Sequence, residues 1–177
     1  LYNFRYNIYS SEWPVTNRLV ELYLQRKSDN NGWEREINGI SNNEKANLLM
    51  ERYSFKELLS DVEHRDLLNN TISLKGYCLF APAEVNMGVS LFRDSLYALL
   101  ERNEFRNMRF ENLLDTLGMI SGADIRAGIS GWDRPTPLPF YTIGQPEVIK
   151  ITNKGQESFV LKQLVSNNSD RDGMLQL

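Results

Sequence analysis

The stretch from Val148 to Leu164, VIKITNKGQESFVLKQL, limits the possible folds of this chain more than any other. It opens with β-branched residues, which favour a short strand. Two continuations then fit the residues. Thr152 can cap a helix that begins directly after it, or Asn153–Gln156 can form the turn of a hairpin whose returning strand is Ser158–Leu164. In both cases a strand closes a unit that begins with the helices before it.

The composition indicates an ordinary globular protein. Hydrophobic residues make up 41% and charged residues 24% of the 177 positions, which argues against disorder and allows one good core or two small lobes. The net charge of −3 excludes a strongly basic protein that coats nucleic acid. The single cysteine, Cys78, excludes an internal disulfide and fits a reducing, cytoplasmic setting. No apolar run approaches the ~20 residues of a membrane span, and no signal peptide is recognisable, so we expect no membrane partner.

The first half of the chain is predicted to be mainly helical. Its opening residues alternate aromatic and polar side chains with a period of two, which is typical of a strand. Ser41 and Glu44 stand three apart, the spacing of a capping box that opens a helix. The predicted elements are a strand at Leu1–Ser10, helices at Ser11–Lys27, Ser41–Tyr53 and Phe55–Leu68, and a buried strand at Ile72–Phe80 that Pro82 ends.

The second half begins with the strongest helical pattern of the chain, an apolar stripe with arginine and glutamate opposite it. We expect helices at Val89–Glu104, Phe110–Leu117 and Ala123–Ile129, followed by an irregular, proline-rich segment at Trp132–Gln145. Leu113–Gly118 and Ser121–Ile129 would meet across a short glycine turn.

The predicted order is three helices with a short tight turn between the second and third, an irregular extended segment, and a strand leading into a helix. This order resembles a winged helix-turn-helix domain, over residues 89–164. Ile151–Glu157 is similar to the strand-Thr-x-x-Gly element found after the wing in many bacterial regulators of this class. The resemblance implies that Ser121–Ile129 is a recognition helix in which Arg126 contacts duplex DNA. It also implies DNA contacts from Ser121, Arg134, Lys150 and Lys154.

The balance of basic and acidic residues allows a second interpretation of the winged-helix resemblance. Basic residues barely outnumber acidic ones between Arg102 and Lys154, so no net basic field attracts phosphate. Winged helices also serve as protein–protein modules, and fold does not determine function. If Arg126 reads DNA, it should be exposed beside the wing; in a scaffold it should pair with Asp124, Asp133 or a partner protein.

A third reading is a metal-dependent nuclease. Asp133, Glu147 and Lys150 loosely match its two carboxylates and lysine. However, Glu147 and Lys150 are three apart and would point to opposite faces of a strand. His64, the only histidine, has no recognisable nucleophile placed with it and is expected on a helix surface. One histidine and one cysteine cannot supply a four-ligand zinc site, so we expect no metal and no cofactor.

The sequence therefore predicts a mostly helical α+β protein. An N-terminal strand and helical region at 1–80 would pack on a winged-helix-like domain at 81–164, and 165–177 would form a polar tail. The favoured function is a non-enzymatic, cytoplasmic DNA-binding or regulatory protein. The alternative is a structural protein–protein interaction subunit, as a homo-oligomer or in a hetero-complex.

Overall fold

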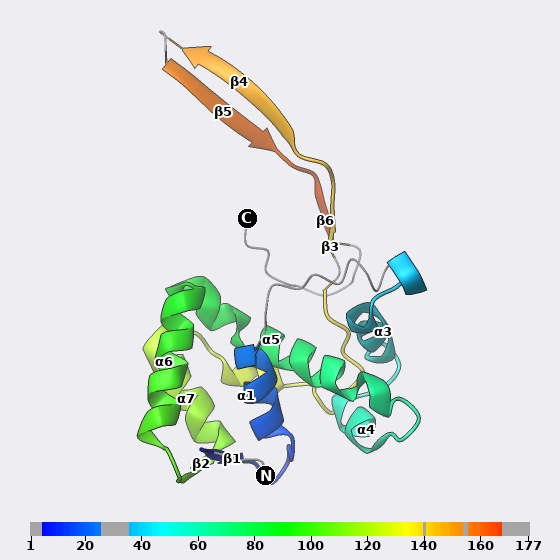
Figure 1. Ribbon diagram of the computed structural model, residues 1–177, viewed down its shortest axis with the longest axis vertical. Helices are drawn as coiled ribbons and strands as arrows, with labels where there is room; N and C mark the ends of the chain where they lie inside the picture. The colour runs from blue at the N-terminus through cyan, green and yellow to red at the C-terminus, as the bar shows by residue number, and fades with distance from the viewer. Residues whose placement is uncertain (1–4, 26–35, 140, 154–155, 168–177) are drawn as a thin grey trace. The chain divides into compact units, whose positions relative to one another are not determined.

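The computed structural model describes residues 5–25, 36–139, 141–153 and 156–167 (Figure 1). In these ranges the protein is mostly helical α+β, as the sequence predicts. The described chain divides between Pro137 and Leu138 into two compact units, which we call the helical unit and the ribbon. The expected boundary between residues 80 and 81 lies inside a helix of the first unit.

The helical unit contains eight α- and 3₁₀-helices among those whose bounds are described, with two short strands. In chain order these are β1 (Asn7–Tyr9), α1 (Thr16–Gln25), α3 (Asn42–Leu49), α4 (Phe55–Ser60), η1 (Arg65–Leu67), α5 (Leu68–Met87), α6 (Val89–Arg102), β2 (Asn107–Arg109), α7 (Phe110–Ser121) and η2 (Arg126–Ile129). Strands β1 and β2 pair in parallel.

Helix α5 is the central helix of this unit and contacts α1, α3, α4, α6 and α7 (Figure 1). No side chain from Thr71 to Glu84 is exposed. The side chains on its less buried sides are also covered, and most of them are apolar. Apolar residues therefore occur on all sides of the helix, which lacks a clear amphipathic period. The predicted strand at Ile72–Phe80 is therefore wrong: the whole run is helical, and the helix continues past Pro82.

Two capping boxes begin the short helices α3 and α4. The predicted one is confirmed: the Glu44 N–H donates to Ser41 Oγ over 3.3 Å, and Glu44 Oε2 accepts from the Ser41 N–H over 2.8 Å. Ser54 and Glu57 form the same pair of bonds at 3.2 and 2.7 Å. Each box satisfies N–H groups that a helix start leaves free.

Most other predicted helices are present with different ends. The prediction at Val89–Glu104 is confirmed by α6, while the one at Phe110–Leu117 continues to Ser121 in α7. Helix α1 begins at Thr16, five residues later than predicted. The opening strand is reduced to β1, and the residues before Arg5 lie outside the described ranges.

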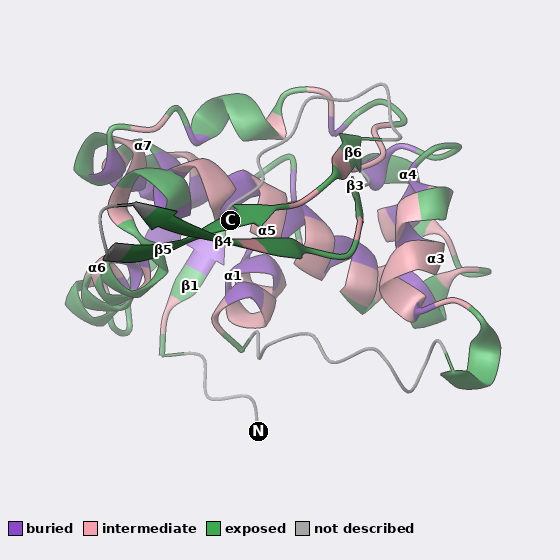
Figure 2. Cartoon of the chain, turned by 90° about the horizontal axis from the view of Figure 1, so that it is seen from above, coloured by how far each residue is buried: buried purple, intermediate pink, exposed green. Residues whose placement is uncertain are grey.

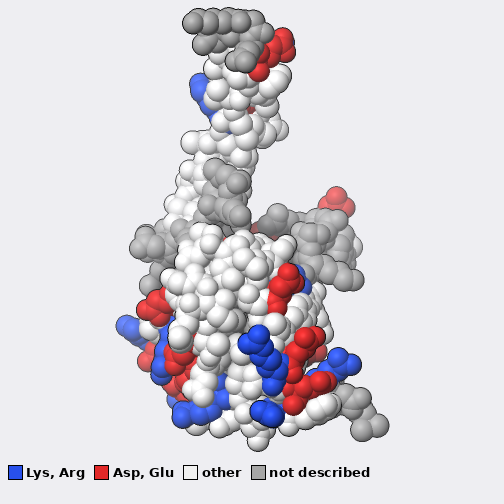
Figure 3. Space-filling model, turned by 90° about the vertical axis from the view of Figure 1, so that its left-hand side faces the viewer, with Lys and Arg blue, Asp and Glu red and all other residues white. Residues whose placement is uncertain are grey.

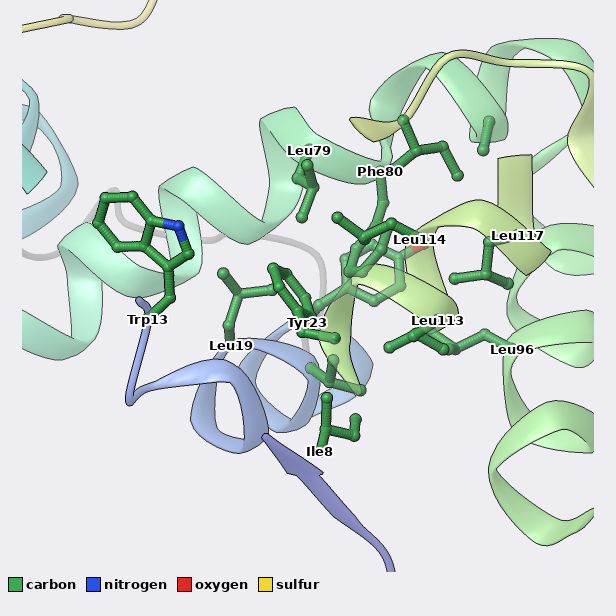
Figure 4. Packing of buried hydrophobic residues seen from close by; sticks show 14 of the residues in the cluster. Ile8, Trp13, Leu19, Tyr23, Leu79, Phe80, Leu96, Leu113, Leu114 and Leu117 are labelled. Atoms are coloured by element: carbon green, nitrogen blue, oxygen red, sulfur yellow. The ribbon is translucent and has the colours of Figure 1, made fainter. Parts of the chain in front are cut away.

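The core of the helical unit joins α1, α5, α6 and α7 (Figure 4). Three rings stand at its centre, with centroid separations of 4.8 Å for Tyr23–Phe80, 5.6 Å for Phe80–Phe92 and 6.0 Å for Tyr23–Phe92. Aromatic pairs at such distances add to the free energy gained by burial. The Tyr23 hydroxyl donates to Glu84 Oε1 over 2.7 Å, so this buried carboxylate has a hydrogen-bond partner.

The ribbon is built from four antiparallel strands, β3 (Tyr141–Ile143), β4 (Glu147–Asn153), β5 (Gln156–Lys162) and β6 (Val165–Asn167). Strand β4 pairs with β5 from Glu147↔Lys162 to Asn153↔Gln156, and β3 pairs with β6. Of the two continuations after Thr152, the hairpin is confirmed and the helix is wrong. The start of the predicted polar tail at 165 is strand β6, and residues 168–177 lie outside the described ranges.

None of the described helices is both long and apolar enough to pass through a lipid bilayer.

Candidate interaction surface

Both faces of the β4–β5 hairpin carry apolar side chains, and little in the described ribbon covers them (Figure 2). Alternation along the two strands sorts these side chains into two sets. Val148, Phe159 and Leu161 share one face, on which they are 62%, 66% and 63% exposed. Ile149, Ile151 and Val160 share the other face. A sheet that is apolar on both faces is typical of one buried on both sides.

The described charged side chains of the hairpin form opposite-charge pairs. Lys150, at the middle of β4, forms an ion pair with Glu157, and Glu147 stands directly opposite Lys162 at one end. Two positive and two negative charges cancel, so these described charges give the hairpin no net attraction for phosphate. Exposed ion pairs contribute little to stability, so the exposed apolar side chains are the more distinctive feature of the hairpin.

The last residues of the helical unit, Trp132–Thr136, are fixed by an aromatic cluster that we call the ring triad. Its members are Trp13, Phe55 and Trp132, all buried. The ring centroids lie 5.1 Å apart for Trp13–Trp132, 5.0 Å for Phe55–Trp132 and 5.9 Å for Trp13–Phe55. The triad thereby joins the segment before α1, the start of α4 and the chain that leads to the ribbon.

Polar contacts fix the same segment. Lys75 of α5 is buried, and its Nζ donates to the Thr136 carbonyl over 3.0 Å. Ser54 and Pro135 form an isolated antiparallel bridge. The Thr136 hydroxyl donates to the Gly131 carbonyl over 3.0 Å. The stiff, proline-rich segment predicted at Trp132–Gln145 therefore begins with residues held to the helical unit.

The region expected to form the recognition helix has a different local structure. Helix α7 extends to Ser121 and ends at Gly122, whose φ of +68° is left-handed. Only a four-residue 3₁₀-helix, η2, follows. The predicted α-helix at Ala123–Ile129 is wrong, because a left-handed glycine ends α7 and no second helix of useful length begins.

The predicted DNA contacts do not converge into one described site. The buried Ser121 hydroxyl donates to the Leu117 carbonyl over 2.8 Å. Arg126 lies 3.2 Å from Asp115, a carboxylate that the sequence reading did not propose as its partner. Arg134 lies 3.8 Å from Asp133. Lys150 belongs to the ribbon and pairs there, and Lys154 lies outside the described residues.

Surface charge on the helical unit is mixed. On the face shown in Figure 3, lysine and arginine are interspersed with aspartate and glutamate, and no broad field of one sign is present. Such mixing gives no electrostatic attraction of the kind that concentrates a protein on nucleic acid.

The two residues of the nuclease reading that belong to the ribbon do not share a face. Asp133 belongs to the helical unit, whereas Glu147 and Lys150 lie on opposite faces of β4 by their register. Among the described residues, no group of three or more His, Cys, Asp and Glu side chains is arranged to hold a metal ion.

His64 lies directly before η1 and contacts Asp61, with 2.6 Å between Nδ1 and Oδ2. Its ring centroid is 5.8 Å from that of Tyr53. The hydrogen bond to Asp61 raises the pKa of His64 above its ordinary value, and the bond to His64 lowers the pKa of Asp61. The contact joins α4 to the turn before α5.

We expect the pKa of His64, measured by NMR titration of the single histidine, to lie above its unfolded value of about 6.5. A raised pKa means that the contact stabilises the fold fully below that unfolded value and loses its effect as pH rises through the folded pKa. Asp61→Asn should return the pKa toward about 6.5 while Asp66→Asn leaves it largely raised. A wild-type midpoint at or below the unfolded value would contradict the contact.

Comparison of the chain with models of protein families, with curated proteins and with solved structures gave no match.

The sequence did not predict two buried features that hold the segment before the ribbon. The ring triad draws its members from three distant segments, and no local pattern connects them. Lys75 lies within the predicted buried strand Ile72–Phe80, but no local pattern indicates its hydrogen bond to Thr136. The apolar residues of β4 and β5 are evident in the sequence, and the predicted hairpin contained them.

Proposed function

We propose that this protein is a non-enzymatic interaction subunit that binds a partner protein through its ribbon, in the cytoplasmic setting predicted from Cys78. The observation that supports this proposal is the apolar character of both hairpin faces. A two-stranded hairpin is marginally stable in water by itself, and it needs more strands or a packing surface. A partner that covers Val148, Phe159 and Leu161 would supply that surface.

The attachment of the ribbon supports the same function. The ring triad and the Lys75–Thr136 hydrogen bond hold the chain up to Thr136 on the helical unit. These contacts order the chain that leads to the ribbon, so this segment loses less conformational freedom when the ribbon binds. The paired state of Arg126 also favours the scaffold reading, since its charge is already matched by Asp115.

The proposal is tested by placing a photo-reactive phenylalanine analogue at Phe159 in the cells that produce the protein. The control carries the analogue at Tyr97, an exposed aromatic on α6. We expect irradiation to give a discrete protein adduct from position 159 and not from position 97. A second substitution, Leu161→Asp, should reduce this adduct at least about tenfold, because a charge would then enter an apolar interface.

Equal labelling from both positions, or none from position 159, would contradict the proposal. Binding to duplex DNA, measured over a range of salt concentrations, tests the DNA-binding alternative. Binding that weakens steeply with salt and is lost in Arg126→Ala would favour the winged-helix reading in its place.

A further inference from the structure

We propose that the outer edge of β5 pairs with β5 of a second copy of this chain, in an antiparallel arrangement that joins two ribbons into one four-stranded sheet. This inference rests on the proposed function of the ribbon, and it names the partner. Its support comes from the difference between the two ribbon edges and from the self-complementary sequence of β5.

The two edges differ in how well they are protected. In the described ribbon, β4 and β5 have each other as their only strand neighbours, so each has a free edge. Strand β4 has Lys150 at its middle and Pro146 directly before it. Lysine and proline are common devices that block pairing at an edge. Strand β5 has Ser158–Leu161 at its middle, with no charge, and the chain from Gln156 to Asn167 has no proline. The open edge is that of β5.

A two-fold axis at Val160 makes the β5 edge complementary to itself. Antiparallel pairing about this point sets Val160 opposite Val160 of the second copy and Phe159 opposite Leu161. Ser158 then stands opposite Lys162, and Glu157 opposite Gln163, so no like charges face each other. Moving the axis one residue to Phe159 would set Glu157 opposite Leu161, which pairs a charge with an apolar side chain. The register at Val160 is therefore the favoured one.

This register also joins the apolar faces of the two ribbons. Ile149 stands opposite Val160 within one ribbon. The four-stranded sheet consequently has a row of Ile149 and Val160 from one copy and Val160 and Ile149 from the other, all β-branched. On the opposite face Val148 and Leu161 continue into Phe159 of the second copy. Such rows of cross-strand neighbours are the unit of sheet stabilisation.

A second copy fits this edge because of symmetry. A two-fold interface uses the same patch on both copies, so one sequence must complement itself, as β5 does. The pairing also raises the strand number from two to four, which exceeds the three needed for independent stability.

The first test is the mass of the full chain by sedimentation equilibrium from about 1 to 100 μM, a range set by typical homodimer affinities. We expect a monomer–dimer equilibrium. Val160→Lys, which sets two lysines opposite each other, should weaken the dimer at least about tenfold. Val160→Thr keeps a β-branched residue of similar shape and should retain the dimer. A monomer at every concentration, or an equal effect of both substitutions, would overturn the inference.

The second test fixes the register, in a Cys78→Ser background that removes the natural thiol. Val160→Cys should form a disulfide-linked dimer on mild oxidation, because paired residues of neighbouring strands are close enough. The control is Ile149→Cys, which lies opposite Val160 in the same ribbon. In the dimer it would be about 14 Å from its counterpart, three strand spacings away, and should not form a disulfide. Equal linkage of the two variants would overturn the register.

The inference and the proposed function fail in different ways. A monomer that still gives a discrete adduct from Phe159 with another protein overturns the second copy and retains the interaction subunit. A monomer that gives no adduct overturns both.

Discussion

Trp132→Ala is expected to lower the free energy of unfolding of the helical unit by about 3–5 kcal/mol. Trp132 is buried and contacts both other rings of the triad at centroid distances near 5 Å. Its removal leaves a cavity beside the stacked rings of Trp13 and Phe55. Chemical denaturation followed by circular dichroism measures the loss.

The matched control for this prediction is Trp132→Phe, which keeps an aromatic ring at the centre of the triad. It should cost clearly less than the alanine variant, because more of the cavity remains filled. A Trp132→Ala protein whose free energy of unfolding stays within about 0.5 kcal/mol of the wild type would show that the triad does not hold this segment.

Gly76→Leu is the second substitution with a large expected effect. Helices α1 and α5 cross closely at Gly76, where an added Cβ would lie 3.0 Å from Leu19 Cγ and 3.3 Å from the Leu19 carbonyl oxygen. The carbonyl cannot move without displacing the α1 backbone. We expect a loss of about 1–3 kcal/mol or more in denaturant unfolding, the usual cost of overpacking a core.

A double-mutant cycle tests whether the contact with Leu19 causes the loss of stability in Gly76→Leu. Leu19→Ala should be destabilising alone, yet it should reduce the cost of Gly76→Leu, because it removes the side chain that the new leucine meets. Val85→Leu, at an exposed position of the same helix, should change stability by no more than about 0.5 kcal/mol. Additive effects of the first two substitutions would contradict the close contact.

The proposed interaction gives the exposed apolar residues of the ribbon a function. Single apolar residues on a surface are common and need no explanation. Val148, Phe159 and Leu161 differ because they stand together on one face of a hairpin whose other face is also apolar. That combination has a cost in water, which a partner that covers one face would reduce; pairing of β5 edges adds cross-strand neighbours along each face.

Local sequence patterns were sufficient to predict several helices. The stripe of α6 has a helical period, and the Ser41–Glu44 box marks the start of α3; both depend on residues within one or two turns. The box at Ser54 and Glu57 has the same spacing and was equally readable. The class of fold followed from such segments.

Other features depend on residues far apart in the chain. Helix α5 has no exposed side chain from Thr71 to Glu84, so its period is hidden and its apolar run resembled a strand. The order of residues after Thr152 allowed both a helix and a hairpin, and seven cross-strand pairs favour the hairpin. Arg126 finds Asp115 because a left-handed Gly122 turns the chain back along α7. For α5 the physical reason is burial: local propensities differ by about 1 kcal/mol or less per residue, and burial against distant segments outweighs them.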